Sequence, residues 1–225
     1  MVFMYSCLLF PILTVSMSML VCRACKDGQI YDNTVTEEDI TGVVEAHNLY
    51  RSTVALGKLE NQPPAQNMQE MSWDDELAKT AQNYANQCVF KHNKDRGEGV
   101  GENLFIKMYG GPHTEREHNF TEAIMSWYDE HVHYKYKTVA QEDFHVRDLR
   151  TQTGHYTQVV WANTNKVGCG FASYSKTEEQ RDELIYVCNY APAGNFLGEY
   201  PYKEGEPDCK ANGMSNSDLD GLCKK

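Results

Sequence analysis

The residue of this 225-residue chain best placed to do chemistry is an imidazole at the head of a patterned stretch. From His155 onward, side chains alternate between two faces. One face would carry Tyr156, Gln158 and Val160, and the other Thr157, Val159 and Trp161. Alternation of β-branched and aromatic residues predicts a strand that begins at His155. A histidine that stands alone in this way is more often a hydrogen-bonded structural residue than a ligand or a base.

No recognisable nucleophile accompanies this imidazole. Catalysis by a Ser–His or Cys–His pair needs a hydroxyl or thiol within hydrogen-bond reach of the base. The sequence has no Gly-x-Ser-x-Gly motif, Ser126 and Ser173 carry no motif context, and pairing of the cysteines would leave no free thiol. We therefore expect a protein that is not an enzyme of the serine or cysteine type.

A second chemical motif lies near the C-terminus. Asn216-x-Asp218-x-Asp220-Gly221 resembles the start of an EF-hand calcium loop, although the first position of such a loop is usually Asp. We interpret residues 204–225 instead as a mobile acidic tail that is closed by a disulfide.

Composition and the N-terminal segment indicate export. Residues Met1–Leu20 are apolar and uncharged, and small residues follow at the usual cleavage spacing, so residues 1–24 are read as a signal peptide. The alternative is an uncleaved membrane anchor, but no Lys or Arg cluster follows to fix one. Cleavage before Cys25 would leave six of the eight cysteines, an even set typical of disulfides in an exported chain. The 32 acidic residues outnumber the 21 basic ones, which argues against nucleic acid and against attachment to anionic lipid by charge.

Helices and strands must position these residues. Residues 25–35 are a polar lead-in, after which Thr36 begins a helix that Gly57 ends. Further helices are expected from Ser72 to Cys88 and over 120–131, with short strands at 100–106, 168–171 and 184–190. Residues 134–146 form a loop or short helix rich in aromatic residues.

The patterned stretches resemble one known family. Gly154–Trp161 resembles the first signature of the CAP superfamily, which includes venom allergens, pathogenesis-related proteins and cysteine-rich secretory proteins. Ile185–Phe196 resembles its second signature, and His47–Arg51 its first-helix motif. The resemblance extends over residues 36–203 and is strongest to venom-allergen-like proteins of parasitic worms. It implies an α+β fold, a three-layer α-β-α sandwich around a small, mainly antiparallel sheet.

The resemblance also implies that four residues scattered in the sequence converge in a cleft: His92, Glu102, Glu130 and His155. Asn93 follows His92 where the family commonly has Ser. Two imidazoles and two carboxylates suit a zinc-like divalent ion, with a carboxylate as a third ligand or as the partner that orients a His. The open alternative is that the carboxylates only hydrogen-bond the imidazoles. If a metal ion were bound, hydrolysis through His92, His155 and a carboxylate would be the one coherent enzymatic alternative.

What the resemblance implies about function is lipid binding. Members of the family bind sterols and fatty acids, and the aromatic side chains Tyr134, Tyr136 and Phe144 could line a loop over such a ligand, or could equally be core. We expect a secreted protein with a host-interaction role, for which metal is not required. The alternative class is a ligand of a host receptor, plasma protein or protease that carries no lipid. We expect no nucleic-acid partner and no stable membrane insertion.

Six cysteines allow fifteen pairings. Cys169 and Cys188 would lie on antiparallel neighbours, a local bridge closes easily between Cys209 and Cys223, and Cys25 is then left for Cys88, as the family resemblance also implies. Cleavage earlier than expected would leave Cys22 as a competitor of Cys25. The sequon Asn119-Phe120-Thr121 predicts an exposed, glycosylated Asn119.

Overall fold

The computed structural model describes residues 24–25, 28–110, 117–144, 151–176 and 179–225. The expected signal peptide lies almost wholly outside the described residues. Among them, none of the helices is both long enough and apolar enough to cross a bilayer.

A central sheet runs through the described chain in the order β1-β2-β5-β6-β4. Its members are β1 (Ala24–Cys25), β2 (Gly28–Asp32), β3 (Ser72–Trp73), β4 (Gly101–Gly110), β5 (Lys166–Lys176) and β6 (Arg181–Ala191). β5 and β6 form a long antiparallel hairpin, β4 pairs with the other edge of β6, and only β3 pairs in parallel, with β5. The mainly antiparallel sheet is therefore as expected.

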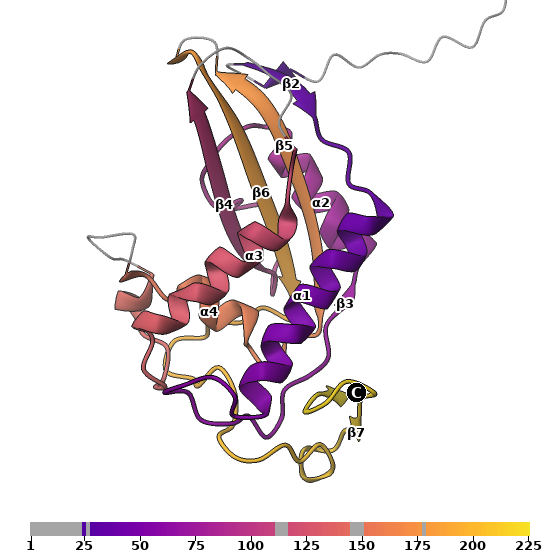
Figure 1. Cartoon of the computed structure of the whole chain (residues 1–225), viewed down its shortest axis with the longest axis vertical. Helices are drawn as coiled ribbons and strands as arrows, with labels where there is room; N and C mark the ends of the chain where they lie inside the picture. Colours follow the sequence, from indigo (N-terminus) through magenta and orange to yellow (C-terminus); the bar gives the residue numbers. More distant parts are fainter. Residues whose placement is uncertain (1–23, 26–27, 111–116, 145–150, 177–178) are drawn as a thin grey trace, which may run out of the picture.

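Helices cover both faces of this sheet (Figure 1). α2 (Asp75–Ala85) packs on β5 and β6 from one side, while α1 (Glu37–Ala55), α3 (Phe120–Tyr128) and α4 (Gly154–Val159) lie on the other. Figure 1 thus shows three layers, α-β-α. A methyl group on Gly168 or Gly170 would overlap the backbone of α2, so these two glycines allow the helix to lie directly on β5.

Local signals explain most of the helix boundaries. Thr36 and Asp39 form a complete capping box at the start of α1, and Gly57 follows its end with a φ of 62°. The second helix begins later than expected because Asp74, not Ser72, is the cap: its carboxylate accepts from the amides of Glu76 and Leu77. Ser72 belongs to β3 instead. α3 ends at Tyr128 and continues as a 3-10 turn over Asp129–His133.

The prediction of a strand at His155 is wrong, because Gly154–Val159 is the short helix α4. The residues that suggested a buried and an exposed face are all nearly inaccessible: Tyr156, Thr157, Gln158, Val159 and Val160 are each at most 1% exposed. A segment buried on every side has no periodicity that reports its secondary structure. The returning strands, β5 and β6, lie where they were expected.

The C-terminal residues form a docked hairpin rather than a mobile tail. β7 (Ser215–Asn216) pairs with β8 (Cys223–Lys224), and Leu222 and Cys223 are 2% and 1% exposed. Cys223 donates its amide to the Met68 carbonyl and accepts at its carbonyl from the amide of Glu70. Closure by the Cys209–Cys223 disulfide was expected; the packing onto residues 68–70 was not.

Candidate functional site

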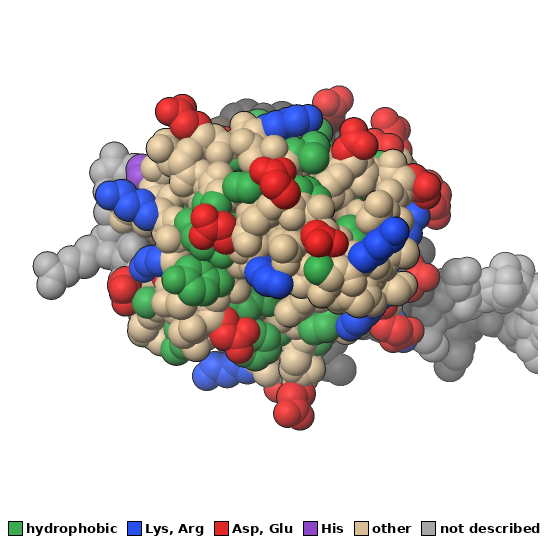
Figure 2. Space-filling model, turned by 90° about the horizontal axis from the view of Figure 1, so that it is seen from below, with side chains coloured by type: hydrophobic (Ala, Val, Ile, Leu, Met, Phe, Trp, Pro, Cys, Tyr) green, Lys and Arg blue, Asp and Glu red, His purple; other side chains and the backbone are tan. Residues whose placement is uncertain are grey.

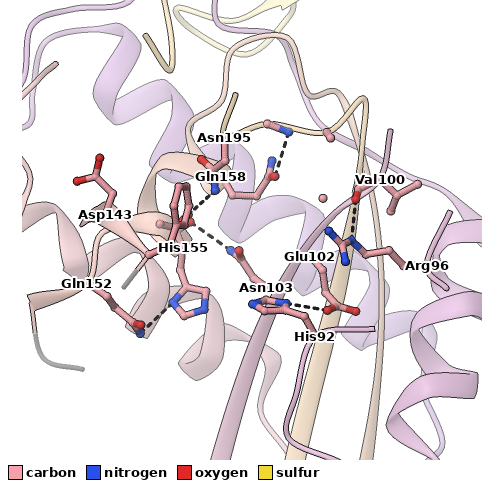
Figure 3. A pocket seen from close by; sticks show the side chains of 15 residues that line it. His92, Arg96, Val100, Glu102, Asn103, Asp143, Gln152, His155, Gln158 and Asn195 are labelled. Carbon is pink, nitrogen blue, oxygen red and sulfur yellow. Dashed lines mark hydrogen bonds and ion pairs between the residues drawn. The ribbon is translucent and has the colours of Figure 1, made fainter. Parts of the chain in front are cut away.

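A cavity of about 320 Å³ opens where five segments meet (Figure 3). The start of β4 contributes Glu102 and Asn103, and α4 contributes His155 and Gln158. Three loops supply further residues: His92 and Arg96 before β4, Gln152 before α4, and Ala193, Gly194 and Asn195 after β6. Residues more than 100 positions apart in the chain therefore share one pocket.

His92 and Glu102 form the first pair of the site. His92 Nδ1 lies 2.8 Å from Glu102 Oε1, which also accepts from the Asn93 amide at 2.9 Å. The Glu102 side chain is fully buried, whereas that of His92 is 59% exposed. Glu102 Oε2 has no hydrogen-bond partner among the described residues. A buried carboxylate thus fixes the ring of an exposed imidazole through Nδ1 and leaves Nε2 open.

His155 and Glu130 form the second pair. His155 Nδ1 lies 2.7 Å from Glu130 Oε1, and Glu130 Oε2 accepts from the backbone amides of His155 and Tyr156 at 2.9 and 3.0 Å. Amides at the start of a helix have no partner within it and carry partial positive charge, so a carboxylate is stabilised there. Glu130 therefore holds both the N-terminus of α4 and the imidazole that this helix presents.

The two imidazoles turn toward each other in the cavity (Figure 3). Both line it, and both also line a neighbouring groove that includes Glu130. The structure thus brings the expected four residues to one place, as two His–Glu pairs. Within the described part of the chain, no group of three or more His, Cys, Asp or Glu side chains is arranged to hold an ion. In each pair the carboxylate bonds Nδ1 of the imidazole and so orients the ring.

Two asparagines that the sequence analysis did not select support α4. Asn103 donates its side-chain amide to the His155 carbonyl at 3.1 Å, and Asn195 donates to the Gly154 carbonyl at 2.8 Å. Thr157 Oγ1 donates to Asn195 Oδ1 at 2.7 Å. Asn103 follows Glu102 directly, and Asn195 lies in the second family signature. Their positions in these motifs could have identified them from the sequence.

An apolar groove adjoins the His pair. It has a volume of about 390 Å³ and lies between β4 and α3, with Lys91, His92, Ser126, Glu130, Gln152 and His155 around it. Its apolar side chains are Phe90, Leu104, Phe105, Ile106 and Trp127. Trp127 is anchored by a hydrogen bond from its indole to the Leu104 carbonyl at 3.0 Å, and Phe90 is 47% exposed. We call this surface the β4–α3 groove.

The three aromatic residues expected over a lipid do not lie together. Tyr134 is 3% exposed and packs against Tyr156 in the core. Tyr136 stacks on Tyr200, away from the histidines, and only Phe144 lines the cavity. Burial raises the pKa of Tyr136 to about 12.

Three disulfides join the pairs that were anticipated. Cys25 is bonded to Cys88, Cys169 to Cys188 and Cys209 to Cys223. Cys169 and Cys188 are direct neighbours in the β5–β6 register. At the sequon, Asn119 is exposed, and its side-chain oxygen caps α3 by accepting from the Glu122 amide.

An α-β-α sandwich with two His–Glu pairs in a cleft and a disulfide across its central hairpin defines a class of small disulfide-bonded domains. Residues 44–190 match the CAP family, the cysteine-rich secretory protein family, and the chain belongs to it.

Several curated proteins are similar to this chain over most of its length. It is 36% identical over 203 residues to salivary antigen-5 of Dipetalogaster maximus, covering 82% of this chain and 76% of that protein. It is 38% identical over 192 residues to peptidase inhibitor 16 of Mus musculus, covering 84% of this chain. The chain spans only 34% of the length of that second relative.

Solved structures agree on the fold. The structure of BmVAL-1 matches with a TM-score of 0.68 at 32% identity, covering 88% of this chain and 98% of that one. The crystal structure of NaASP2 with Zn²⁺ matches with a TM-score of 0.68 at 33% identity, covering 86% and 98%.

Proposed function

We propose that this protein is an exported, non-enzymatic lipid-binding protein that takes up a sterol or a fatty acid and acts on a host. The observation that carries the proposal is the β4–α3 groove beside the His pair. Phe90 is exposed there, and Phe105 and Ile106 of β4 are only partly buried, so apolar surface remains open to solvent.

The groove suits an amphipathic ligand. An acyl chain or a sterol ring would cover Phe90, Phe105 and Ile106, and burial of apolar surface contributes about 25 cal/mol per Å². A hydroxyl or carboxyl head would then lie near His92 and His155, which line both the groove and the polar cavity. The expected ligand is therefore a molecule with one polar end and one apolar end.

Lipid extraction tests this function directly. Protein secreted from eukaryotic cells is extracted and its lipids are identified by mass spectrometry, and saturable binding of labelled cholesterol and palmitate is measured. We expect a Kd of 1 μM or tighter for one class, about −8 kcal/mol.

A matched pair of variants locates the lipid. Phe90→Asp should weaken lipid binding at least tenfold, because it places a charge in the apolar groove. Leu49→Asp, at a 63% exposed position on α1, should leave binding unchanged. Absence of saturable binding for both lipid classes would overturn the proposal.

Export is supported by the family description and by three disulfides, which persist in oxidising compartments. Exposed Asn119 is then a glycan acceptor.

The relative named peptidase inhibitor 16 motivates the alternative of a protein-directed ligand, acting on a host receptor or protease. Retained host-cell activity by lipid-free protein would favour that alternative.

The His pairs fit a divalent ion in one respect. Both rings are held at Nδ1 by carboxylates, which is how metal-bound histidines are oriented, and Nε2 of His92 and of His155 would be the ligands. A bound ion would supply Lewis-acid character at that place, and Glu102 and Glu130 would set the ring orientation. The comparison structure described with Zn²⁺ supports the same proposal.

Calorimetry with zinc tests the metal site. His92→Ala and His155→Ala should each abolish stoichiometric uptake, while His133→Ala, at an exposed position outside the pocket, should not. Lipid binding should survive the first two variants, since apolar burial supplies it. Unchanged uptake in the double variant would exclude these ligands.

Zinc-dependent hydrolysis of a peptide and ester panel, lost in both variants, would instead favour the hydrolase alternative.

A further inference from the structure

A second groove, made of stacked aromatic rings, lies away from the histidines. It has a volume of about 530 Å³, and Tyr136, Trp161, Tyr200, Pro201 and Tyr202 form its apolar part. We call it the aromatic groove. The segment 192–205 and the C-terminal hairpin lie at the lower end of the molecule (Figure 1), and the view from below shows hydrophobic side chains interleaved with acidic and basic ones (Figure 2).

The rings of the aromatic groove form a ladder. Tyr136 stands between Tyr200 and Tyr202, with ring centroids 5.0 and 4.9 Å away and interplanar angles of 27° and 33°. Tyr200 is 52% exposed, while Tyr202 is 3% exposed and forms the floor. The ladder therefore ends in an open aromatic face.

Hydrogen bonds hold the ladder in place before any ligand binds. Tyr136 donates its hydroxyl to the Tyr202 carbonyl at 2.6 Å, and Tyr202 donates its own to the Pro63 carbonyl at 3.1 Å. The Pro201 carbonyl accepts from the Ala162 amide at 2.7 Å. A preformed groove loses little conformational entropy when it binds a ligand.

One donor in the groove is open to a ligand. Trp161 lines the groove, and among the described residues its indole N–H donates to no acceptor, yet it is not one of the polar atoms sealed from solvent. An indole N–H can only donate, so a ligand that offers an acceptor oxygen can bond it in place of water.

Charges at the rim indicate the sign of the ligand. Glu199 and Glu204 line the groove and are exposed, and neither forms an ion pair with a described residue. Lys203 is the one basic residue along it. Two free carboxylates against one ammonium, on a chain of net charge −11, favour a ligand with a basic group.

We propose that the aromatic groove binds a proline-rich peptide segment that carries an arginine or lysine. A polyproline II helix has no internal hydrogen bonds, so its carbonyl oxygens are free to accept from Trp161, and its proline rings pack between aromatic side chains. The basic residue pairs with Glu199 or Glu204. Aromatic grooves flanked by carboxylates are a recurring solution for such peptides, and this site is independent of the lipid groove.

Fluorescence anisotropy on the intact secreted protein tests the proposal. The probe is a labelled peptide of Pro-Pro-Ala repeats with one terminal arginine. We expect saturable binding that Tyr200→Ala weakens at least tenfold. Trp161→Phe, which keeps a ring and removes the donor, should weaken it several-fold. The doubly substituted Glu199→Gln, Glu204→Gln protein should lose the preference for the arginine peptide over an arginine-free one.

Two controls make the test specific. Phe90→Asp, in the lipid groove, should leave peptide binding unchanged, and Tyr200→Ala should leave lipid binding unchanged. No saturable binding, or equal binding of a glycine-rich peptide with the same charge, would overturn the proposal. So would a Tyr200-dependent response to an oligosaccharide panel or a Tyr200-dependent self-association in place of peptide binding. Tyr200 is exposed, so its variant is informative even where Trp161→Phe fails to fold.

Discussion

His47 is a histidine buried completely on α1, where an imidazole must stay neutral. Its Nδ1 donates to the Val43 carbonyl at 2.7 Å, and its Nε2 accepts from the Tyr190 hydroxyl at 2.9 Å. Burial lowers the pKa of His47 to about 4, and the nearby Arg51 charge acts in the same direction. The imidazole is therefore a structural group whose protonation opposes folding.

This burial predicts an acid sensitivity. The unfolded chain takes up a proton at this residue below about pH 6.5, whereas the folded protein resists until about pH 4. More protons are then bound in the unfolded state, so the free energy of unfolding decreases as pH falls through this window. Between pH 7 and 5 we expect a loss of about 2 kcal/mol from His47.

Urea denaturation at the two pH values checks this contribution. His47→Gln should reduce the pH-dependent loss by that amount, whatever its effect on stability at pH 7. His133→Gln, at an exposed position, should leave the pH dependence as it is. An identical pH dependence in His47→Gln and the parent protein would contradict the prediction.

At the scale of elements, one guanidinium links α1 to two loops. Arg51 is 0% exposed and donates to five carbonyl oxygens. The acceptors are the carbonyls of Gln69, Val159, Trp161, Ala162 and Thr164, at 2.7 to 3.2 Å. Burial lowers the pKa of Arg51 to about 9, so it remains charged at neutral pH. The end of α4 is thus tied to the first helix.

Loss of this guanidinium should be costly. Arg51→Met leaves several buried carbonyls without a donor, and we expect the free energy of unfolding to fall by at least about 3 kcal/mol in urea denaturation. Lys79→Met, at a side chain that is 70% exposed on α2, should change it by less than about 0.5 kcal/mol. A loss below about 1 kcal/mol for Arg51→Met would show that the loops satisfy these carbonyls in another way.

At the scale of the whole molecule, the C-terminal hairpin is docked on the loop that Arg51 also holds. Gln69 forms a bridge with Cys223 and accepts from Arg51 at its carbonyl. Ser52 of α1 donates to the Asp220 carbonyl at 2.6 Å. The hairpin therefore belongs to the same packed unit as the helices, through contacts other than the Cys209–Cys223 bridge.

Removal of that disulfide tests how the hairpin is held. Cys209→Ser with Cys223→Ser should destabilise the hairpin by about 3 kcal/mol, the entropy of closing a loop of about 15 residues. Limited proteolysis should then cleave within 204–225 while the remaining chain stays resistant. Equal resistance of the parent and the variant would mean that packing alone holds the hairpin.

Much of the fold could be predicted from the sequence because the signals are local. The capping box of Thr36 and Asp39, the β-branched and aromatic run of residues 184–190 and the spacing of Cys209 and Cys223 are all signals between residues close together in the chain. Four expected site residues were also placed, but only by their resemblance to a family. No spacing relates His92 to His155, since their meeting depends on how β4 and α4 pack.

Only the tertiary structure decided that residues 154–159 form a helix, that Glu130 caps it, and that the C-terminal residues are docked. The segment after His155 is buried on all sides, so its sequence carries no period, and burial with a carboxylate from α3's extension selects the helix. Similarly, the structural role of Arg51 follows from the five carbonyls it donates to, and that of Glu102 from the imidazole it orients. Partners are set by chain segments that are distant in sequence, and local chemistry cannot specify them.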